Sequence, residues 1–88
     1  MHIQIVLFDG FDLLDVIAPY EVFTAAAMYS NETITVELVS AEGERMVTSG
    51  VNHLQIKASS KLALTRKGII LVPGAFGSIH DNGPESIP

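Results

Sequence analysis

The chain is short, apolar and acidic: it has 88 residues, of which 48% are hydrophobic and 17% charged, with a net charge of −5 and a mean hydropathy of +0.36. Soluble domains usually carry about 25% charged residues, so this chain has little polar surface with which to cover itself. We therefore expect an obligate assembly or a piece of a larger domain. The acidic balance argues against nucleic acid as a direct partner. The absence of cysteine excludes a disulfide scaffold, a zinc-thiolate site and any cysteine nucleophile carried by this chain.

Nothing in the sequence indicates a targeting or membrane segment. The N-terminal residues lack a basic region and a small-residue cleavage site, and no apolar run approaches the roughly 18–20 residues that span a bilayer. We expect a cytoplasmic protein without membrane contact.

The first elements of the chain are a strand and a helix. Residues 3–8 form a nearly unbroken run rich in Ile and Val, which is typical of a strand in a parallel sheet that is covered on both faces. From residue 12 apolar positions recur every three or four residues, which indicates a helix. Proline suits a first helical turn and interrupts a helix interior. Pro19 therefore predicts a regular helix over residues 19–29, after a tight turn or short 3₁₀ entry over residues 12–18.

Three further strand regions follow the helix. Residues 33–41 alternate between apolar and polar positions, which predicts a strand with one less buried face. Residues 45–49 and 52–59 read as a hairpin at the edge of the sheet, followed by a basic connector over residues 61–67. Residues 68–72 are again continuously apolar, which predicts a second fully buried strand. This order of elements indicates an α/β fold with a parallel sheet.

The final residues point toward a further helix. Residues 80–88 read as a loop in which Pro84 occupies a helix-start position. One clear helix cannot cover both faces of a parallel sheet of about three strands. The sequence therefore predicts that residues 1–88 are the N-terminal half of a single α/β domain.

Two segments stand where ligands of open α/β sheets bind, at the carboxyl ends of the two apolar strands. Asp9, Asp12 and Asp15 follow the first strand, and the turn over residues 73–77 follows the second. Backbone N–H groups of such a turn can face an anion or a developing oxyanion, and a carboxylate beside them suits acid–base chemistry. Asp15 is the best candidate because it lies between two apolar residues, where burial could raise its pKa.

Structural roles compete with these functional ones. Asp9 and Asp12 are most simply turn and capping residues. The pattern leaves Asp15 open between a helix-entry cap and a functional carboxylate. Turn dipeptides such as Pro73-Gly74 close strands in many proteins.

The histidines do not indicate a metal site. His2, His53 and His80 are far apart in the sequence and lack metal-ligand spacing, and His80-Asp81 reads as a solvated loop pair. We expect no metal and no cofactor.

The chain as a whole resembles the ThiJ/PfpI superfamily, of the class I glutamine amidotransferase-like type. Residues 3–23 are similar to the strand and the "D-x-x-GP-x-EVF" segment of the branch that holds isonitrile hydratases and the amidotransferase-like domains of AraC-type regulators. Asp15 and Ala18-Pro19 fall on that motif. Residues 68–77 resemble the "lllvPGG.G" strand and turn, and residues 47–51 resemble the small hairpin between these motifs.

The resemblance implies a flavodoxin-like three-layer α/β sandwich, usually dimeric, of which this chain is an incomplete part. It implies a catalytic acid at Asp15 and oxyanion-type backbone donors at Gly74 and Ala75, where alanine replaces the family's second glycine. The third part of the implied site, a cysteine on a strand-to-helix elbow, has no counterpart in this chain. The 88 residues alone are therefore expected to be inactive.

The resemblance to isonitrile hydratase implies hydration of an isocyanide, a small-molecule substrate, to an N-substituted formamide. A cysteine outside this chain would attack the isocyanide carbon, and Asp15 would place or activate water. Two alternatives remain: a ligand-sensing domain of an AraC-type transcriptional regulator, and a non-catalytic domain that binds a small molecule in the same pocket.

Overall fold

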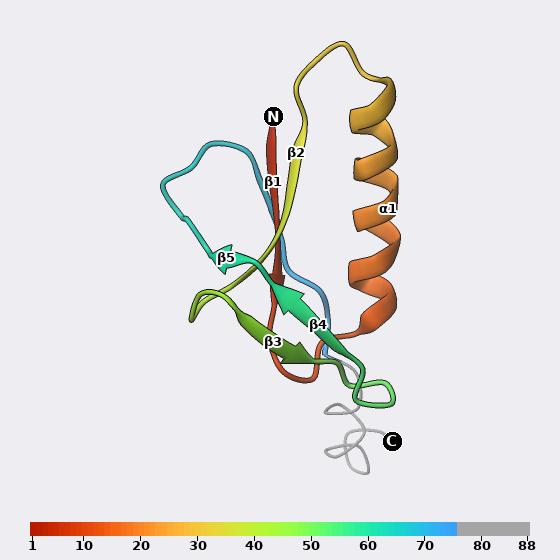
Figure 1. Cartoon of the computed structure of the whole chain (residues 1–88), viewed down its shortest axis with the longest axis vertical. Helices are drawn as coiled ribbons and strands as arrows, with labels where there is room; N and C mark the ends of the chain where they lie inside the picture. Colours follow the sequence, from red (N-terminus) through yellow and green to blue (C-terminus); the bar gives the residue numbers. More distant parts are fainter. Residues whose placement is uncertain (76–88) are drawn as a thin grey trace.

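The computed structural model describes residues 1–75, which form a four-stranded sheet, a two-stranded hairpin and one helix (Figure 1). The elements, in chain order, are β1 (His2–Leu7), α1 (Leu13–Tyr29), β2 (Thr35–Ser40), β3 (Arg45–Thr48), β4 (Gln55–Ala58), β5 (Ser60–Lys61) and β6 (Ile69–Leu71). Within these residues no helix is long and apolar enough to cross a membrane.

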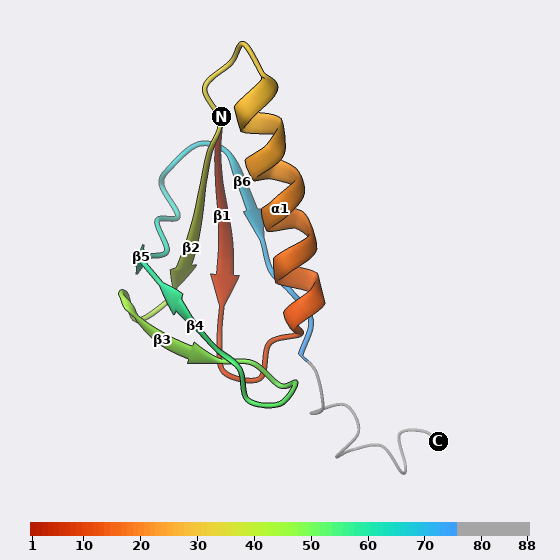
Figure 2. The same cartoon turned by 45° about the vertical axis from the view of Figure 1, so that its right-hand side comes forward.

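Strand β1 lies at the centre of the sheet, between β2 and β6, as Figure 2 shows. The order is β5-β2-β1-β6, and every pairing in it is parallel. Ile3, Ile5 and Leu7 of β1 are buried and form the middle of the hydrophobic core. The predicted α/β fold with a parallel sheet is confirmed, and the sequence run that predicted β1 corresponds to its most buried strand.

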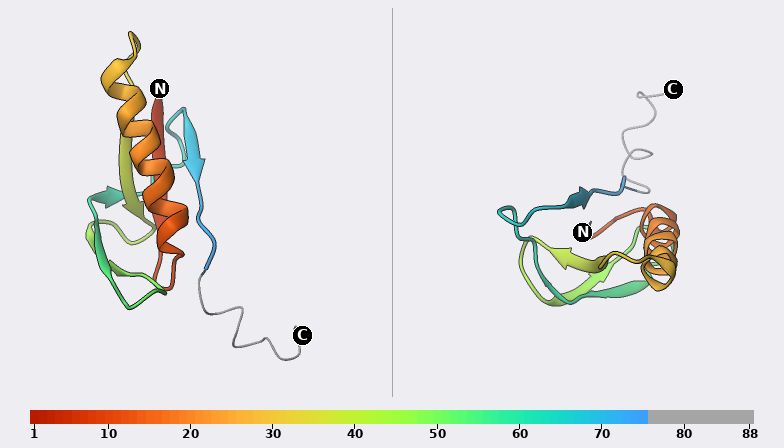
Figure 3. Two further views of the ribbon diagram at one scale, coloured as in Figure 1. Left: turned by 90° about the vertical axis from the view of Figure 1, so that its right-hand side faces the viewer. Right: turned by 90° about the horizontal axis from the view of Figure 1, so that it is seen from above.

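The helix covers one face of the sheet, running antiparallel to β1 (Figure 3). Val16 is its fully buried residue, and Leu13, Tyr20 and Phe23 are partly buried against the core. Successive side chains of β1 alternate between the two faces of the sheet, so the core residues of β1 and these helix residues meet on the same face.

The predicted start of the helix at Pro19 is wrong. Residues 12–18 are not a separate turn, because α1 is continuous from Leu13 and contains Pro19 in its interior. The helix begins early because Asp12 caps it: its carboxylate oxygen Oδ1 accepts a hydrogen bond from the Leu14 N–H at 3.1 Å. Pro19 removes only the helix hydrogen bond that would end on the Asp15 carbonyl, and packing of α1 on the sheet compensates for that loss.

The predicted hairpin is present but lies elsewhere than expected. Strands β3 and β4 pair antiparallel in a sheet of their own, at the carboxyl end of β1 (Figure 1). Backbone hydrogen bonds attach this hairpin to the loop after β1, from the Gly10 N–H to the Thr48 carbonyl at 2.7 Å and from the Gly50 N–H to the Phe11 carbonyl at 2.9 Å. The edge of the main sheet is taken by β5, which overlaps the region predicted as a basic connector.

Strand β6 is not fully buried, contrary to the sequence-based prediction. Ile69 and Ile70 are exposed, and Val72 just after the strand is 68% exposed. Strand β6 pairs only with β1, so its other edge has no partner among residues 1–75. Apolar composition alone predicted the strand, but burial depends on which elements lie beside it.

The second face of the sheet is partly polar. Gln4 of β1 is buried, and its side-chain amide pairs with the backbone of Ala63, donating to the carbonyl at 2.9 Å and accepting from the N–H at 2.8 Å. These two hydrogen bonds satisfy a buried amide and fix the segment that leads from β5 to β6 over the sheet.

Candidate functional site

The segments after β1 and β6 meet, as the parallel topology predicts. The Asp12 N–H donates to the Gly74 carbonyl at 2.7 Å, and Phe11 and Ala75 form an antiparallel bridge. In the opposite direction, the Gly74 N–H donates to Oδ2 of Asp15 at 3.1 Å. Two of the three residues that the sequence analysis assigned to the site, Asp15 and Gly74, are therefore in direct contact, and Ala75 is adjacent.

Phe11 holds this junction together. Its side chain is the largest among the fully buried ones, and its backbone also bridges to Ser49 of the hairpin. The loop after β1, the hairpin and the turn after β6 therefore share one buried anchor. Asp15 stands one helical turn beyond this anchor, in the first turn of α1.

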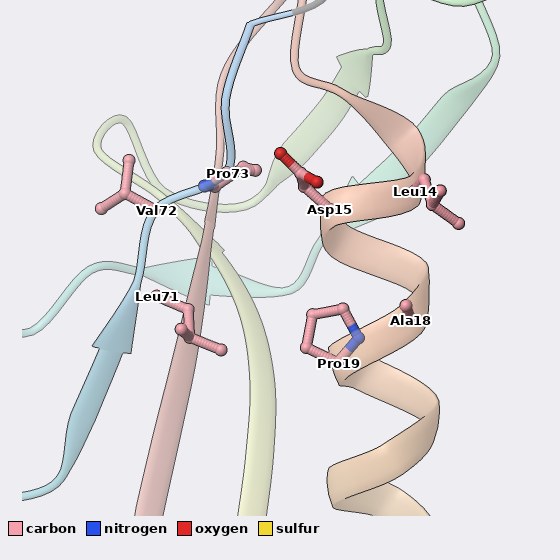
Figure 4. Close-up of a pocket in the computed structure, with 7 residues that line it drawn as sticks. All are labelled: Leu14, Asp15, Ala18, Pro19, Leu71, Val72 and Pro73. Atoms are coloured by element: carbon pink, nitrogen blue, oxygen red, sulfur yellow. The ribbon is translucent and has the colours of Figure 1, made fainter.

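A cavity of about 420 Å³ opens between α1 and the end of β6 (Figure 4). Seven residues line it, and Asp15 is the one charged residue among them: Leu14, Asp15, Ala18, Pro19, Leu71, Val72 and Pro73. Figure 4 shows the Asp15 carboxylate directed from α1 toward the segment that contains Pro73. The candidate site is thus a small, mostly apolar pocket with a carboxylate at one end.

The predicted burial of Asp15 is wrong. Its apolar neighbours in the sequence suggested an apolar environment, but Asp15 is exposed and Leu14 is 70% exposed, whereas Val16 alone of the three is buried. Successive helix residues point in directions about 100° apart, so a buried residue does not bury its neighbours in the chain. Asp15 lies on the solvent-exposed side of α1, where its carboxylate contacts the turn after β6.

The backbone donor predicted at Gly74 is occupied. Its N–H is directed at Asp15, and a Cβ at position 74 would stand 3.3 Å from Oδ2 of that residue. The carboxylate therefore lies tightly against a backbone without a side chain. The roles of Gly74 and Ala75 as oxyanion donors stay predictions, since here the Gly74 N–H holds the acid in place.

The structural interpretations of Asp9 and Asp12 agree with the structure. Asp12 is the N-cap of α1, as described above. Asp9 lies in the turn after β1, where its Oδ1 accepts the Thr48 N–H at 3.0 Å and lies 3.4 Å from Nη1 of Arg45. The Thr48 hydrogen bond, followed by Arg45, lowers the pKa of Asp9 from its ordinary value.

Sequence reasoning missed Arg45 altogether. Its guanidinium also donates from Nε to Glu42 at 3.2 Å, and both carboxylates raise its pKa, Asp9 foremost. Arg45 stands 36 residues from Asp9 in the chain, and no spacing signal links the two. The contact fastens the hairpin to the loop from which the site is built.

His2 and His53 lie away from the site. His2 is buried at the start of β1, with Nε2 3.4 Å from Oε1 of Glu37 but without the geometry of a hydrogen bond. His53 is exposed at the hairpin tip with a left-handed backbone. His80, Asp81 and Pro84 lie outside the described residues. Over residues 1–75 no three His, Asp or Glu side chains gather in a way that could hold a metal ion.

Comparison with solved structures shows which known proteins have a similar fold. No family model matches the sequence, and no curated protein matches it either. Among solved structures, the chain is similar to DJ-1beta from Drosophila melanogaster, with a TM-score of 0.70 and 22% identity over 97% of this chain and 44% of that one. It is also similar to an AraC family transcriptional regulator from Pseudomonas putida, with a TM-score of 0.71 and 15% identity over 98% of this chain and 52% of that one.

These likenesses show the fold. The chain has the α/β architecture of DJ-1-like and AraC-regulator domains, and it spans about half the length of the two structures that it matches.

Proposed function

We propose that the chain belongs to the ThiJ/PfpI superfamily and supplies the acidic half of a site that hydrates an isocyanide to an N-substituted formamide, as in isonitrile hydratases. Two independent features support this proposal. The sequence carries the resembling strand, "D-x-x-A-P-x-E-V-F" segment and Pro-Gly turn in the family's order, and the fold is similar to that of DJ-1-like domains.

The observation that carries the proposal is the contact between Asp15 and Gly74. A general base must be held within reach of the proton that it accepts, and one carboxylate oxygen of Asp15 is fixed by the Gly74 N–H at 3.1 Å. Its other oxygen has no protein hydrogen-bond donor among residues 1–75. That oxygen can take a water proton at the wall of the cavity.

The reaction divides between Asp15 and a cysteine outside this chain. The thiolate adds to the terminal carbon of R–N≡C, and that same carbon takes up a proton, which gives the thioimidate R–N=CH–S–Cys. Water assisted by Asp15 then adds to this carbon while the nitrogen takes up a proton, and the thiolate leaves, giving R–NH–CHO. The sum is one isocyanide and one water to one formamide, without an oxidant or reductant. The apolar walls, among them Leu71 and Val72, suit the group R.

An assay of formamide formation tests this proposal. The complete protein that contains these residues is incubated with a small alkyl isocyanide, before and after alkylation of its cysteines. We expect turnover that alkylation abolishes. Absence of cysteine-dependent turnover would contradict the proposed reaction.

A second candidate is a ligand-sensing domain of an AraC-type regulator. The similarity to the Pseudomonas putida regulator favours it. A helix-turn-helix region after the complete domain, with DNA binding that responds to a small molecule, would support this candidate over the enzyme. A pocket that binds a small molecule without turnover and without a DNA-binding region would instead support a non-catalytic binding domain.

A further inference from the structure

Within the described part of the chain, the side chains around the Asp15 cavity offer hydrogen-bond acceptors and no donors. Six of the seven lining residues are Leu, Ala, Pro or Val, and the seventh is the carboxylate of Asp15. One oxygen of this carboxylate is used by the Gly74 N–H. The other is available to a ligand, and an ionised carboxylate can only accept.

A proline on each wall of the cavity removes a backbone hydrogen-bond donor. Pro19 on α1 and Pro73 after β6 have no N–H, so neither contributes a backbone donor. Within residues 1–75, the polar side chain at the cavity is therefore that of Asp15.

Among residues 1–75, no basic side chain lines the cavity to compensate the charge of Asp15. None of its seven lining residues is Lys, Arg or His. Arg45 and Lys57, two of the chain's five basic residues, form ion pairs within or beside the hairpin. A ligand that brings its own positive charge or N–H donors would complete this site, whereas an anion would meet a carboxylate.

We propose that the Asp15 cavity selects small aliphatic molecules that carry an N–H donor, of which a primary alkylammonium ion is the simplest. The inference rests on the proposed function in one respect, that this cavity is a small-molecule site. It adds the ligand class: a short branched alkyl group against Leu71, Val72 and Pro19, and an N–H group on Asp15. The N-substituted formamide expected as product has the same combination of alkyl group and N–H.

A binding titration with matched, unreactive probes tests the inference. Isobutylammonium and isobutyrate have similar branched bodies and opposite polar ends. We expect isobutylammonium to bind the protein at least about tenfold more tightly, as one charge-assisted hydrogen bond implies. Protein NMR then follows the amide signals of Asp15, Leu71 and Gly74 in both titrations.

Variants locate the effect. Asp15→Asn keeps an oxygen for the Gly74 N–H but turns the free position into a donor, so we expect the preference for ammonium to disappear. Glu21→Gln removes a carboxylate of α1 that does not line this cavity, and we expect it to leave the preference unchanged.

The outcomes separate this inference from the proposed reaction. Equal binding of the two probes, or a loss in Glu21→Gln as large as in Asp15→Asn, would overturn the inference. Isocyanide turnover without ammonium selectivity would overturn the inference and leave the reaction standing. Selectivity for ammonium without turnover would support the inference and overturn the reaction.

Discussion

The backbone N–H of Gly74 donates a hydrogen bond to Oδ2 of Asp15 at 3.1 Å and so joins residues that are 59 positions apart in the chain. It connects the first turn of α1 to the turn after β6 and, among residues 1–75, engages one of the two carboxylate oxygens.

Removing this carboxylate should loosen the junction without unfolding the protein. We expect Asp15→Ala to lower the free energy of unfolding by about 0.5–1.5 kcal/mol, the usual net value of one hydrogen bond, because Asp15 is exposed. The Gly74 amide should exchange its hydrogen faster in this variant than in Asp15→Asn, where an oxygen acceptor remains. Equal exchange in both variants would show that the hydrogen bond does not hold the turn. Chemical denaturation and hydrogen-exchange NMR make the two measurements.

Phe11 should be the most sensitive core position near the site. Its side chain is fully buried where the loop after β1, the hairpin and the turn after β6 meet. We expect Phe11→Ala to cost about 3–5 kcal/mol, measured by chemical denaturation. Met28→Ala is the control: Met28 is 72% exposed on α1, and its loss should change stability by no more than about 0.5 kcal/mol. Similar effects of the two substitutions would contradict the central position of Phe11.

Gly68 should tolerate no side chain. A Cβ there would lie 1.9 Å from the His2 carbonyl oxygen, and the backbone φ of +139° already disfavours other residues. We expect Gly68→Ala to lower the melting temperature far more than Gly10→Ala does. Gly10 also has a positive φ, of +91°, but a Cβ added there would have no atom within 4 Å. Its substitution should cost only the backbone strain, about 1–2 kcal/mol. A larger loss at Gly10 than at Gly68 would contradict the close approach of β6 to β1.

Stability should fall in acid partly through Asp9. The Thr48 N–H and Arg45 lower the pKa of Asp9 below its ordinary value of 3.8. A carboxyl with a lowered folded pKa stabilises the protein fully above its unfolded pKa, and that contribution is lost as the pH falls through the folded pKa. Asp9→Asn should therefore be less stable than the wild type at neutral pH and approach it below about pH 4. Urea denaturation across this range measures the difference.

A second carboxyl, that of Glu44, should also make the stability of the protein fall in acid. Glu44 pairs with Lys57 at 2.8 Å, and that contact lowers its pKa as well, so some acid sensitivity should persist in Asp9→Asn. A constant difference between Asp9→Asn and the wild type from pH 7 to pH 2 would rule out the proposed ionisation of Asp9 as its cause.

Local pattern was sufficient for every strand except β5 and for the meeting of the two site segments. An unbroken apolar run indicated β1, and the parallel order of the elements implied that Asp15 and Gly74 lie at the same end of the sheet. That inference needed only topology, since the carboxyl ends of neighbouring parallel strands are adjacent by geometry.

Features that depend on tertiary surroundings were not predicted. The start of α1 is decided by capping at Asp12 and by packing on the sheet, which outweigh the local preference of Pro19. The exposure of Asp15 depends on the direction in which its side chain leaves the helix. The contact of Asp9 with Arg45 joins two exposed side chains 36 residues apart, for which the sequence contains no periodic signal.

The rate of formamide formation by Asp15→Asn, compared with that of Asp12→Asn, tests the central claim most directly. Both variants replace one carboxylate near the start of α1, but of these two carboxylates only that of Asp15 lines the cavity and accepts the Gly74 N–H. In the complete protein, we predict that Asp15→Asn lowers isocyanide turnover by about 100-fold or more, as loss of a general base does, while Asp12→Asn retains most of it. Turnover by Asp15→Asn equal to that of the wild type would contradict the assignment of Asp15 as the general base of the site.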